Sequence, residues 1–268
     1  NLPKVLEKVC RERRGLVLVT GTTGSGKSTT LAAIIDCINS TRTEHIITIE
    51  DPIELLHRDK KAFINQREVE VDTKGFADAL RSAFRQDPDV ILLGEMRDHE
   101  TIQTALVAAE TGHLVLSTLH TLDATETIHR IIAVFPPHQQ KQIRLQLASV
   151  IRAIISIRLI RKADGLGRVP AVEVLLATEF IRDCIINQDK TRMIREAIAA
   201  GTSQYGMQTF DQSIYNLYME KLINYDEGLK QASNPDEFKL RIEGIRSTSD
   251  AAKEEMEKSV NQFERLHK

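Results

Sequence analysis

The sequence has little that would suggest a membrane, zinc or nucleic-acid protein. No apolar run approaches the ~20 residues needed to cross a bilayer, and no signal peptide is recognisable. The three cysteines, Cys10, Cys37 and Cys184, are far apart and form no C-x-x-C pair, so neither a zinc site nor a redox motif is supported. The net charge of −2 provides no basic field for nucleic acid. We therefore expect a cytoplasmic protein that neither inserts into a membrane nor binds nucleic acid.

A glycine-rich loop is the strongest positive signal. Residues 21–28 read GTTGSGKS and fit G-x-x-x-x-G-K-[ST], the phosphate-binding loop. The apolar residues 15–20 before it predict a buried strand, and the helical spacing of apolar residues 31–38 after it predicts a helix. We expect the nucleotide to be bound by Gly21, Thr22, Thr23, Gly24, Ser25, Gly26, Lys27, Ser28 and Thr29. In this motif the lysine reaches the terminal phosphates and the serine hydroxyl ligates Mg²⁺.

Strands and helices alternate over the first two thirds of the chain, which predicts a wound α/β sheet. We predict a core domain over residues 1–177 and a C-terminal helical region over 178–268. Residues 63–71 read as a strand or a hairpin, and residues 249–268 as a charged helical tail. The other predicted strands are 43–49, 90–93, 113–120, 154–160 and 168–175, of which the last two form an antiparallel hairpin.

Two carboxylates follow predicted strands, at the sheet edge where open α/β sheets bind ligands. Glu50 ends a β-branched strand and is a candidate for polarising an attacking water. Glu95 follows the apolar run 90–93 as a Walker B acid would, and is a candidate metal ligand with Ser28. Sequence reasoning does not separate the roles of the two glutamates, and Asp51 and Glu54 are weaker candidates.

Two histidines bracket the predicted strand 113–120. A single histidine is more often structural, but His113 and His120 at strand ends near a phosphate site are candidates to contact the γ-phosphate. Arg81, Arg85 and Arg97 are phosphate-directed or intersubunit cations, or, for the first two, part of a solvated helix face.

Four motifs in a fixed order resemble those of the secretion-type hexameric ATPases of type II and type IV systems. The loop 21–28 is similar to the family's Walker A motif, and residues 47–54 to its Asp box. Residues 87–98 resemble its Walker B motif, and residues 108–121 its His box. The later stretch 206–213, GMQTFDQS, resembles the branch of the family that drives type IV pilus retraction.

The resemblance implies a RecA-like P-loop NTPase core that uses ATP and Mg²⁺. It implies that Glu50 activates water, that Glu95 is the Walker B acid, and that His113 and His120 are the His-box residues. The family works as a homohexamer on an inner-membrane pilus platform protein, so the resemblance implies a peripheral location at the inner-membrane pilus base.

Three departures from the family pattern bear on this reading. Thr22 stands where the family often has proline, and residues 180–187 only partly echo a late motif linked to retraction. The family's N-terminal PAS-like domain does not occur in this chain, and together with Asn1 this suggests a C-terminal fragment. A cysteine-rich zinc insertion, typical of pilus assembly and type II secretion relatives, is not found either.

The hypothesis that follows is a hexameric ATPase powering pilus retraction and twitching motility. The alternatives are a pilus assembly or type II secretion ATPase, and a nucleotide-gated assembly module with low turnover. A DNA translocase on the same core is disfavoured by the balanced charge.

Overall fold

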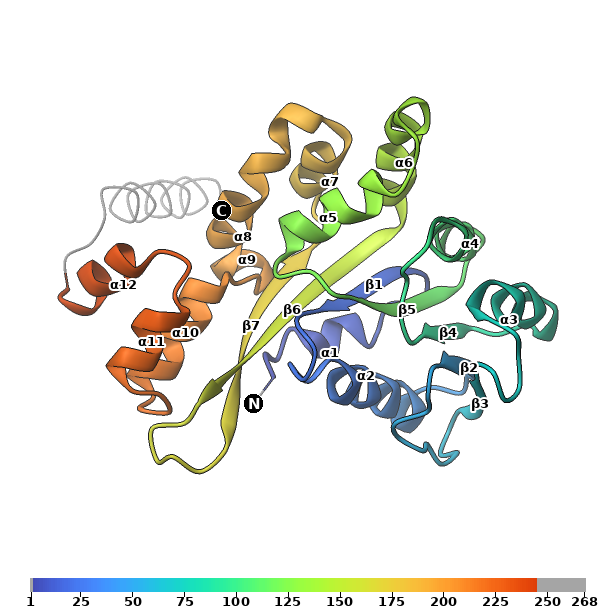
Figure 1. Ribbon diagram of the computed structural model, residues 1–268, viewed down its shortest axis with the longest axis horizontal. Coiled ribbons are helices and arrows are strands. Elements are labelled where there is room, and N and C mark those ends of the chain that lie inside the picture. The colour runs from blue at the N-terminus through green and yellow to red at the C-terminus, as the bar shows by residue number, and fades with distance from the viewer. Residues whose placement is uncertain (1, 245–268) are drawn as a thin grey trace, which may run out of the picture. The chain divides into compact units, whose positions relative to one another are not determined.

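The computed structural model describes residues 2–244, so the predicted tail at 249–268 lies outside the described residues. By its contacts the chain divides into two units. The first comprises the residues up to 159 together with 172–209, and the second comprises 160–171 together with the chain from 210 onward (Figure 1). The phosphate-binding loop lies in the first unit.

A seven-stranded sheet carries the site, in the order β3-β2-β4-β5-β1-β6-β7. The pairs β3–β2, β2–β4, β4–β5, β5–β1 and β1–β6 are all parallel. Backbone bonds from Ala177 to Arg152 and from Lys162 to Gly167 show that β6 and β7 form the predicted antiparallel hairpin. The strands are β1 (Gly15–Thr20), β2 (His45–Glu50), β3 (Phe63–Glu68), β4 (Val90–Leu93), β5 (Leu114–Leu119), β6 (Ile151–Arg161) and β7 (Arg168–Leu176).

The helices follow the predicted alternation. Those of the first unit are α1 (Leu6–Val9), α2 (Lys27–Thr41), α3 (Phe76–Ala83), α4 (His99–Glu110), α5 (Ala124–Ala133), α6 (Pro137–Val150), α7 (Glu179–Ile186), α8 (Ile194–Ala200) and α9 (Thr202–Tyr205), with 3-10 turns η1 (Phe84–Gln86) and η2 (Gln188–Met193). The second unit contains α10 (Phe210–Met219), α11 (Tyr225–Gln231) and α12 (Pro235–Ile242). The prediction of a wound α/β fold is confirmed.

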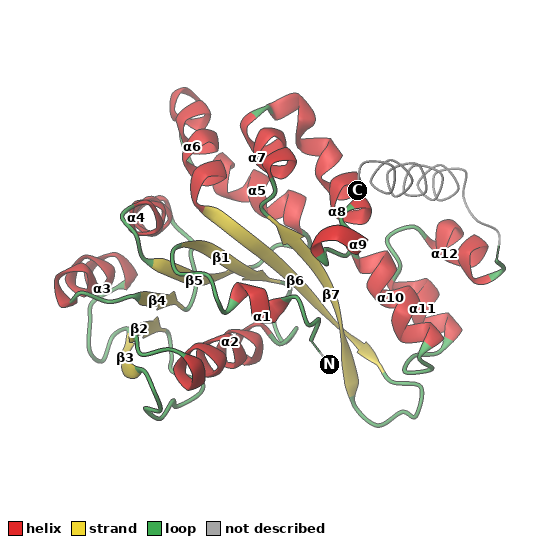
Figure 2. Ribbon diagram, turned by 180° about the vertical axis from the view of Figure 1, so that it is seen from behind, coloured by secondary structure: helices red, strands yellow, loops and turns green. Residues whose placement is uncertain are grey.

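The sheet of the first unit is buried on both faces because alternate residues of its strands point to opposite sides. Val17 and Val19 of β1 pack with α1 and α2, whereas Leu16 and Leu18 pack in a core shared with helices α3 to α8. Figures 1 and 2 show α1 and α2 on one side of the sheet and α5 and α6 on the other. All six residues of β1 are buried. Such a strand gives the loop that follows it a rigid base.

Helices α7 and α8 pack on the same core as the sheet. Ile181, Cys184 and Ile185 of α7, with Ile194 of α8, are buried there. By contacts, residues 178–209 therefore group with the first unit, whereas the composition shift from which the domain boundary was predicted lies at 177. The shift marks the end of the last strand, and these short helices have no core of their own.

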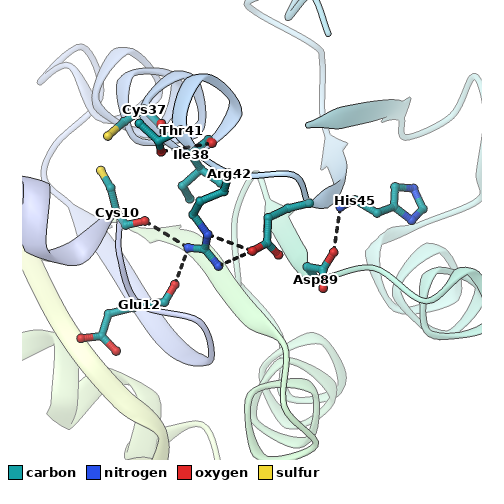
Figure 3. A network of polar contacts seen from close by, with 9 residues as sticks. Cys10, Glu12, Cys37, Ile38, Thr41, Arg42, His45 and Asp89 are labelled. Carbon is teal, nitrogen blue, oxygen red and sulfur yellow. Dashed lines mark hydrogen bonds and ion pairs between the residues drawn. The ribbon is translucent and has the colours of Figure 1, made fainter. Parts of the chain in front are cut away.

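The C-terminal end of α2 is tied to the segment that precedes β1. Arg42 Nη1 donates to the carbonyl oxygens of Cys10, at 3.1 Å, and Glu12, at 2.6 Å (Figure 3). The same guanidinium forms an ion pair with Glu44 at 2.9 Å. These bonds fix the far end of the helix whose first residue is Lys27.

Candidate active site

The loop between β1 and α2 has the backbone that a phosphate-binding loop requires. Gly21 has φ +146°, and a Cβ on it would lie 2.5 Å from both the carbonyl oxygen of Ile157 and Ser25 Oγ. Gly26, at φ +96°, is the N-cap of α2 and gives it no side-chain hydrogen bond. The first N–H groups of a 15-residue helix thus remain for an anion, and the helix dipole favours negative charge there.

Lys27 is buried at the start of α2. Its Nζ donates to the carbonyl oxygens of Gly21 and Thr22, each at 3.0 Å, which bends the loop around the ammonium group. Burial lowers the pKa of Lys27, while the negative charges of Glu95 and Glu54 act in the opposite direction. The Lys27 ammonium group can form charge-assisted hydrogen bonds to phosphate oxygens.

A cavity of about 500 Å³ lies beside this loop. Walker A residues form one wall, and the ends of three parallel strands supply the acids and the histidine of the other. The predicted site residues that line it are Thr23, Gly24, Gly26, Lys27, Ser28, Thr29, Glu50, Glu95 and His120, and the weaker candidates Asp51 and Glu54 line it as well. Gly21, Thr22 and Ser25 do not line it and shape the loop instead.

Glu95 has two nitrogen-bearing neighbours in this cavity, the cation Arg97 and the imidazole of His120. Arg97 Nε lies 2.6 Å from Glu95 Oε1, and His120 Nε2 lies 3.7 Å from Glu95 Oε2. The Glu95 side chain is only 15% exposed, whereas that of Arg97 is 73% exposed. The acid is fixed in the cavity, and the arginine reaches it from solvent.

His120 follows β5 and faces the same acid. Burial lowers the pKa of His120, the charges of Lys27 and Arg97 lower it further, and Glu95 partly opposes them. The imidazole is therefore neutral near pH 7, and its one N–H can donate a hydrogen bond to a phosphate oxygen.

Glu50 is oriented by two donors on one carboxylate oxygen. Thr48 Oγ1 donates to Glu50 Oε1 at 2.6 Å, and Gln66 Nε2 donates to the same atom at 3.1 Å. In the described chain, Glu50 Oε2 accepts no hydrogen bond. The second oxygen is thus open to a further hydrogen bond.

His113 does not join this cavity. It lies before the first residue of β5, while His120 follows the last, and an extended strand separates the two by about 20 Å. His113 Nδ1 lies 3.0 Å from the carbonyl oxygen of Ala108, and its ring packs against Phe84. Two histidines that bracket a strand lie at its opposite ends. His113 therefore lies away from the cavity and contacts the end of α4.

The predicted arginines differ in their surroundings. Arg97 reaches the cavity, whereas Arg81 forms ion pairs with Asp78 and Glu100 on the exposed side of α3. Arg85 is exposed and does not line the cavity.

The donor set suits Mg²⁺ bound together with a nucleotide. Ser28 offers a hydroxyl and Glu95 a carboxylate, and both line the cavity. Residues 2–244 contain no cluster of three or more His, Cys, Asp or Glu side chains able to hold a metal ion by themselves. Mg²⁺ is usually held by one or two carboxylates together with substrate phosphates and water. The residues present fit that arrangement.

Three polar residues of the site were not predicted from the sequence. Thr48 and Gln66 hold Glu50, and Thr118 Oγ1 donates to the carbonyl oxygen of Gly94 at 2.7 Å, which fixes the turn before Glu95. All three lie within or near β-rich runs. Only Thr48 had a signal in the sequence: residues two apart on a strand share a face, which places Thr48 on the same side as Glu50.

No helix in the described part of the chain is long and apolar enough to cross a membrane.

Comparison with known proteins gives one family. The model of the type II/IV secretion system protein family matches residues 2–209. The type IV pilus retraction ATPase PilT of Pseudomonas aeruginosa is 51% identical over 238 residues, which are 89% of this chain and 68% of that protein. A twitching motility protein of Neisseria gonorrhoeae is 50% identical over 87% of this chain and 62% of its own length. This chain thus spans about two thirds of these relatives.

A solved structure agrees with the sequence matches. The pilus retraction motor PilT with bound ADP superposes with a TM-score of 0.82 at 50% identity, over 88% of this chain and 66% of that one. The predicted α/β P-loop NTPase fold is confirmed by this match. The chain belongs to the type II/IV secretion system protein family, and over most of its length it is similar to the type IV pilus retraction ATPases of that family.

Proposed function

We propose that this chain hydrolyses ATP and that the reaction powers retraction of a type IV pilus. The observation that carries the proposal is the single cavity in which Lys27, Glu50, Glu95 and His120 meet. The relatives named for pilus retraction and twitching motility support retraction, as opposed to extension, of the pilus. The ADP bound in the solved relative supports an adenine nucleotide as the ligand.

The residues divide the chemistry between them. Lys27 and the N-terminal amides of α2 bind the terminal phosphates and orient the γ-phosphate. Glu50 accepts a proton from the attacking water through the oxygen that Thr48 and Gln66 leave unoccupied. His120 donates a hydrogen bond to a γ-phosphate oxygen. Ser28 and Glu95 would hold Mg²⁺, which neutralises phosphate charge when it is bound.

The proposal includes an assembly. We place the chain in a homohexamer on the cytoplasmic side of the inner membrane, where it acts on the pilus platform protein and not on nucleic acid. Family membership supports this assembly. The net charge of −2 gives no overall basic field that would favour nucleic acid.

A nucleotide-gated module with low turnover is the second candidate, and one contact favours it. Arg97 occupies the carboxylate that would hold the metal. If that pair persists in the nucleotide complex, the chain binds ATP and hydrolyses it slowly. A pilus assembly or type II secretion ATPase shares the same chemistry. The missing C-x-x-C pair speaks against this alternative.

Steady-state ATPase assays with purified protein test the chemistry. Lys27→Ala should abolish nucleotide binding, whereas Glu50→Gln and Glu95→Gln should retain ADP binding and lose turnover by about 10²-fold or more. Lys74→Ala and Glu220→Gln, at exposed positions, are the matched controls and should behave as wild type. Normal turnover in both Glu50→Gln and Glu95→Gln would refute the assignment of this cavity as the site of ATP hydrolysis.

Complementation of a retraction-defective strain tests the biological role. The wild-type gene should restore twitching, and its Lys27→Ala variant should not. Restoration of piliation without retraction would point to an assembly ATPase instead.

A further inference from the structure

The edge strand β3 brings a glutamine to the acid proposed to activate water. In the parallel pairing of β2 with β3, Thr48 is opposite Gln66 and Glu50 is opposite Glu68. Residues two apart on a strand share a face, so Thr48, Glu50 and Gln66 lie on the same side of the sheet. The register therefore places an amide within reach of the carboxylate.

The orientation of the Gln66 amide follows from its partners. The backbone N–H of His57 donates to Gln66 Oε1 at 2.8 Å, and only an oxygen can accept that bond. The amide nitrogen must then face the other two partners, Glu50 Oε1 at 3.1 Å and the carbonyl oxygen of Leu55 at 3.0 Å. Both of its protons are used, so the amide cannot turn without losing three bonds.

We propose that Gln66 is a positioning residue for hydrolysis. It fixes one oxygen of Glu50 and leaves the other for the attacking water, and it ties the acid to the segment 51–57 that walls the cavity. This inference rests on the proposed role of Glu50 in ATP hydrolysis. Gln66 itself does not line the cavity, so it acts through Glu50.

The tie to segment 51–57 makes the acid sensitive to the position of that wall. Leu55 and His57 both line the cavity, and Gln66 holds the backbone of both. A second anchor does not touch Glu50: the backbone N–H of Ile53 donates to Glu68 Oε2 at 3.0 Å. The two anchors allow the effect on the acid to be separated from the effect on the wall.

The central test is Gln66→Met, which keeps the length of the side chain and removes its hydrogen bonds. Loss of a hydrogen bond to a charged group corresponds to about a 10- to 100-fold change, and we expect kcat to fall in that range. The KM for ATP and the affinity for ADP should not change, because the bond is proposed to act on the acid and not on nucleotide binding. A fall in ADP affinity of the same size as the fall in kcat would overturn the proposal.

A second variant, Gln66→Glu, retains a polar side chain at this position in case Gln66→Met fails to fold. Gln66→Glu keeps an acceptor for the His57 N–H but can donate neither to Glu50 nor to the Leu55 carbonyl, and it adds a negative charge beside Glu50, so kcat should fall while the His57 anchor remains. Glu68→Met is the matched control that releases the wall and spares Glu50, and it should retain most of the turnover. Equal losses of kcat in Glu68→Met and Gln66→Met would show that wall anchoring, not the orientation of Glu50, is responsible.

A double-mutant comparison separates this inference from the proposed function. In single-turnover reactions, Gln66→Met should add nothing to Glu50→Gln if it acts through that acid. A further loss of the same factor in the double variant would overturn the inference. Wild-type turnover by Glu50→Gln would instead overturn the proposed role of Glu50, and a dead Glu50→Gln beside a normal Gln66→Met would refute the inference alone.

Discussion

Arg97 Nε lies 2.6 Å from Glu95 Oε1, so the acid proposed to hold the metal is paired with a cation two residues along the chain. The arginine is largely exposed and the glutamate is not. The pair therefore opens by moving the arginine into solvent, while Glu95 stays in the cavity.

Arg97→Gln should lower the Mg²⁺ concentration that half-saturates ATP hydrolysis, because Mg²⁺ no longer competes with the guanidinium for Glu95. Because the guanidinium is solvated, we take the pair at the ~0.2–1 kcal/mol of surface ion pairs, which corresponds to a shift of up to about fivefold. Titration of the ATPase rate with Mg²⁺ measures it. Arg85→Gln, at an exposed position outside the cavity, is the control. A higher half-saturating concentration in Arg97→Gln would contradict the competition.

Glu173 of β7 is predicted to make stability depend on pH. Burial raises the pKa of Glu173 to about 7, although its Oε1 accepts the N–H of Ala124 at 2.9 Å. The folded chain thus holds a proton that the unfolded chain has released above pH 4.5. The contribution to the free energy of unfolding is fully present below the unfolded pKa and is lost as pH rises through about 7.

Glu173→Gln should remove this dependence. At pH 8 the variant should be more stable than wild type by an amount on the order of 3 kcal/mol, at 1.36 kcal/mol per pKa unit. Near pH 5 the difference should shrink. Urea unfolding at several pH values tests this, with the exposed Glu179→Gln as control. A difference that does not grow with pH would show that the buried carboxylate is stabilised by its surroundings.

Cys10 should resist alkylation in the folded protein. Burial and the hydrogen bond with Cys37 raise the pKa of the Cys10 thiol to about 12, so almost no thiolate is present at pH 8. The two side chains are drawn together in Figure 3. Iodoacetamide labelling read by mass spectrometry should modify Cys10 only after unfolding in urea. Rapid labelling of native protein at Cys10 would disprove the burial.

Gly21→Ala should destabilise the loop that holds the phosphates. Its Cβ would meet the Ile157 carbonyl oxygen and Ser25 Oγ, and its φ is in the region that favours glycine. We expect a loss of about 1–3 kcal/mol in the free energy of unfolding, as for overpacking, together with weaker ADP binding. Gly75→Ala, where no atom lies within 4 Å, should lose neither. Equal ADP affinity in both variants would argue against this role for Gly21.

The sequence predicted the convergence of the site because parallel strands bring their carboxyl ends to one edge of the sheet. Lys27, Glu50, Glu95 and His120 follow from that rule and lie in one cavity. The same rule places His113, which precedes β5, at the opposite end of that strand, so a site at one end of the strands cannot include both histidines.

Long-range partners were beyond the reach of local patterns. Gln66 takes its role from Glu50 and from the backbone of residues 55 and 57, and nothing in its own neighbours marks it. The grouping of α7 and α8 with the sheet likewise depends on contacts between segments distant in sequence.

The order of the strands determines when, during folding, the phosphate-binding loop gains the neighbouring strands that support it. Leu16 of β1 pairs with Val115 on one side and with Ile151 on the other. Val115 lies 99 residues after Leu16 and Ile151 lies 135 residues after it, so β1 has neither neighbour until long after its own synthesis. Contacts of such high sequence separation slow folding, so the phosphate-binding loop gains its support late, when β6 is in place.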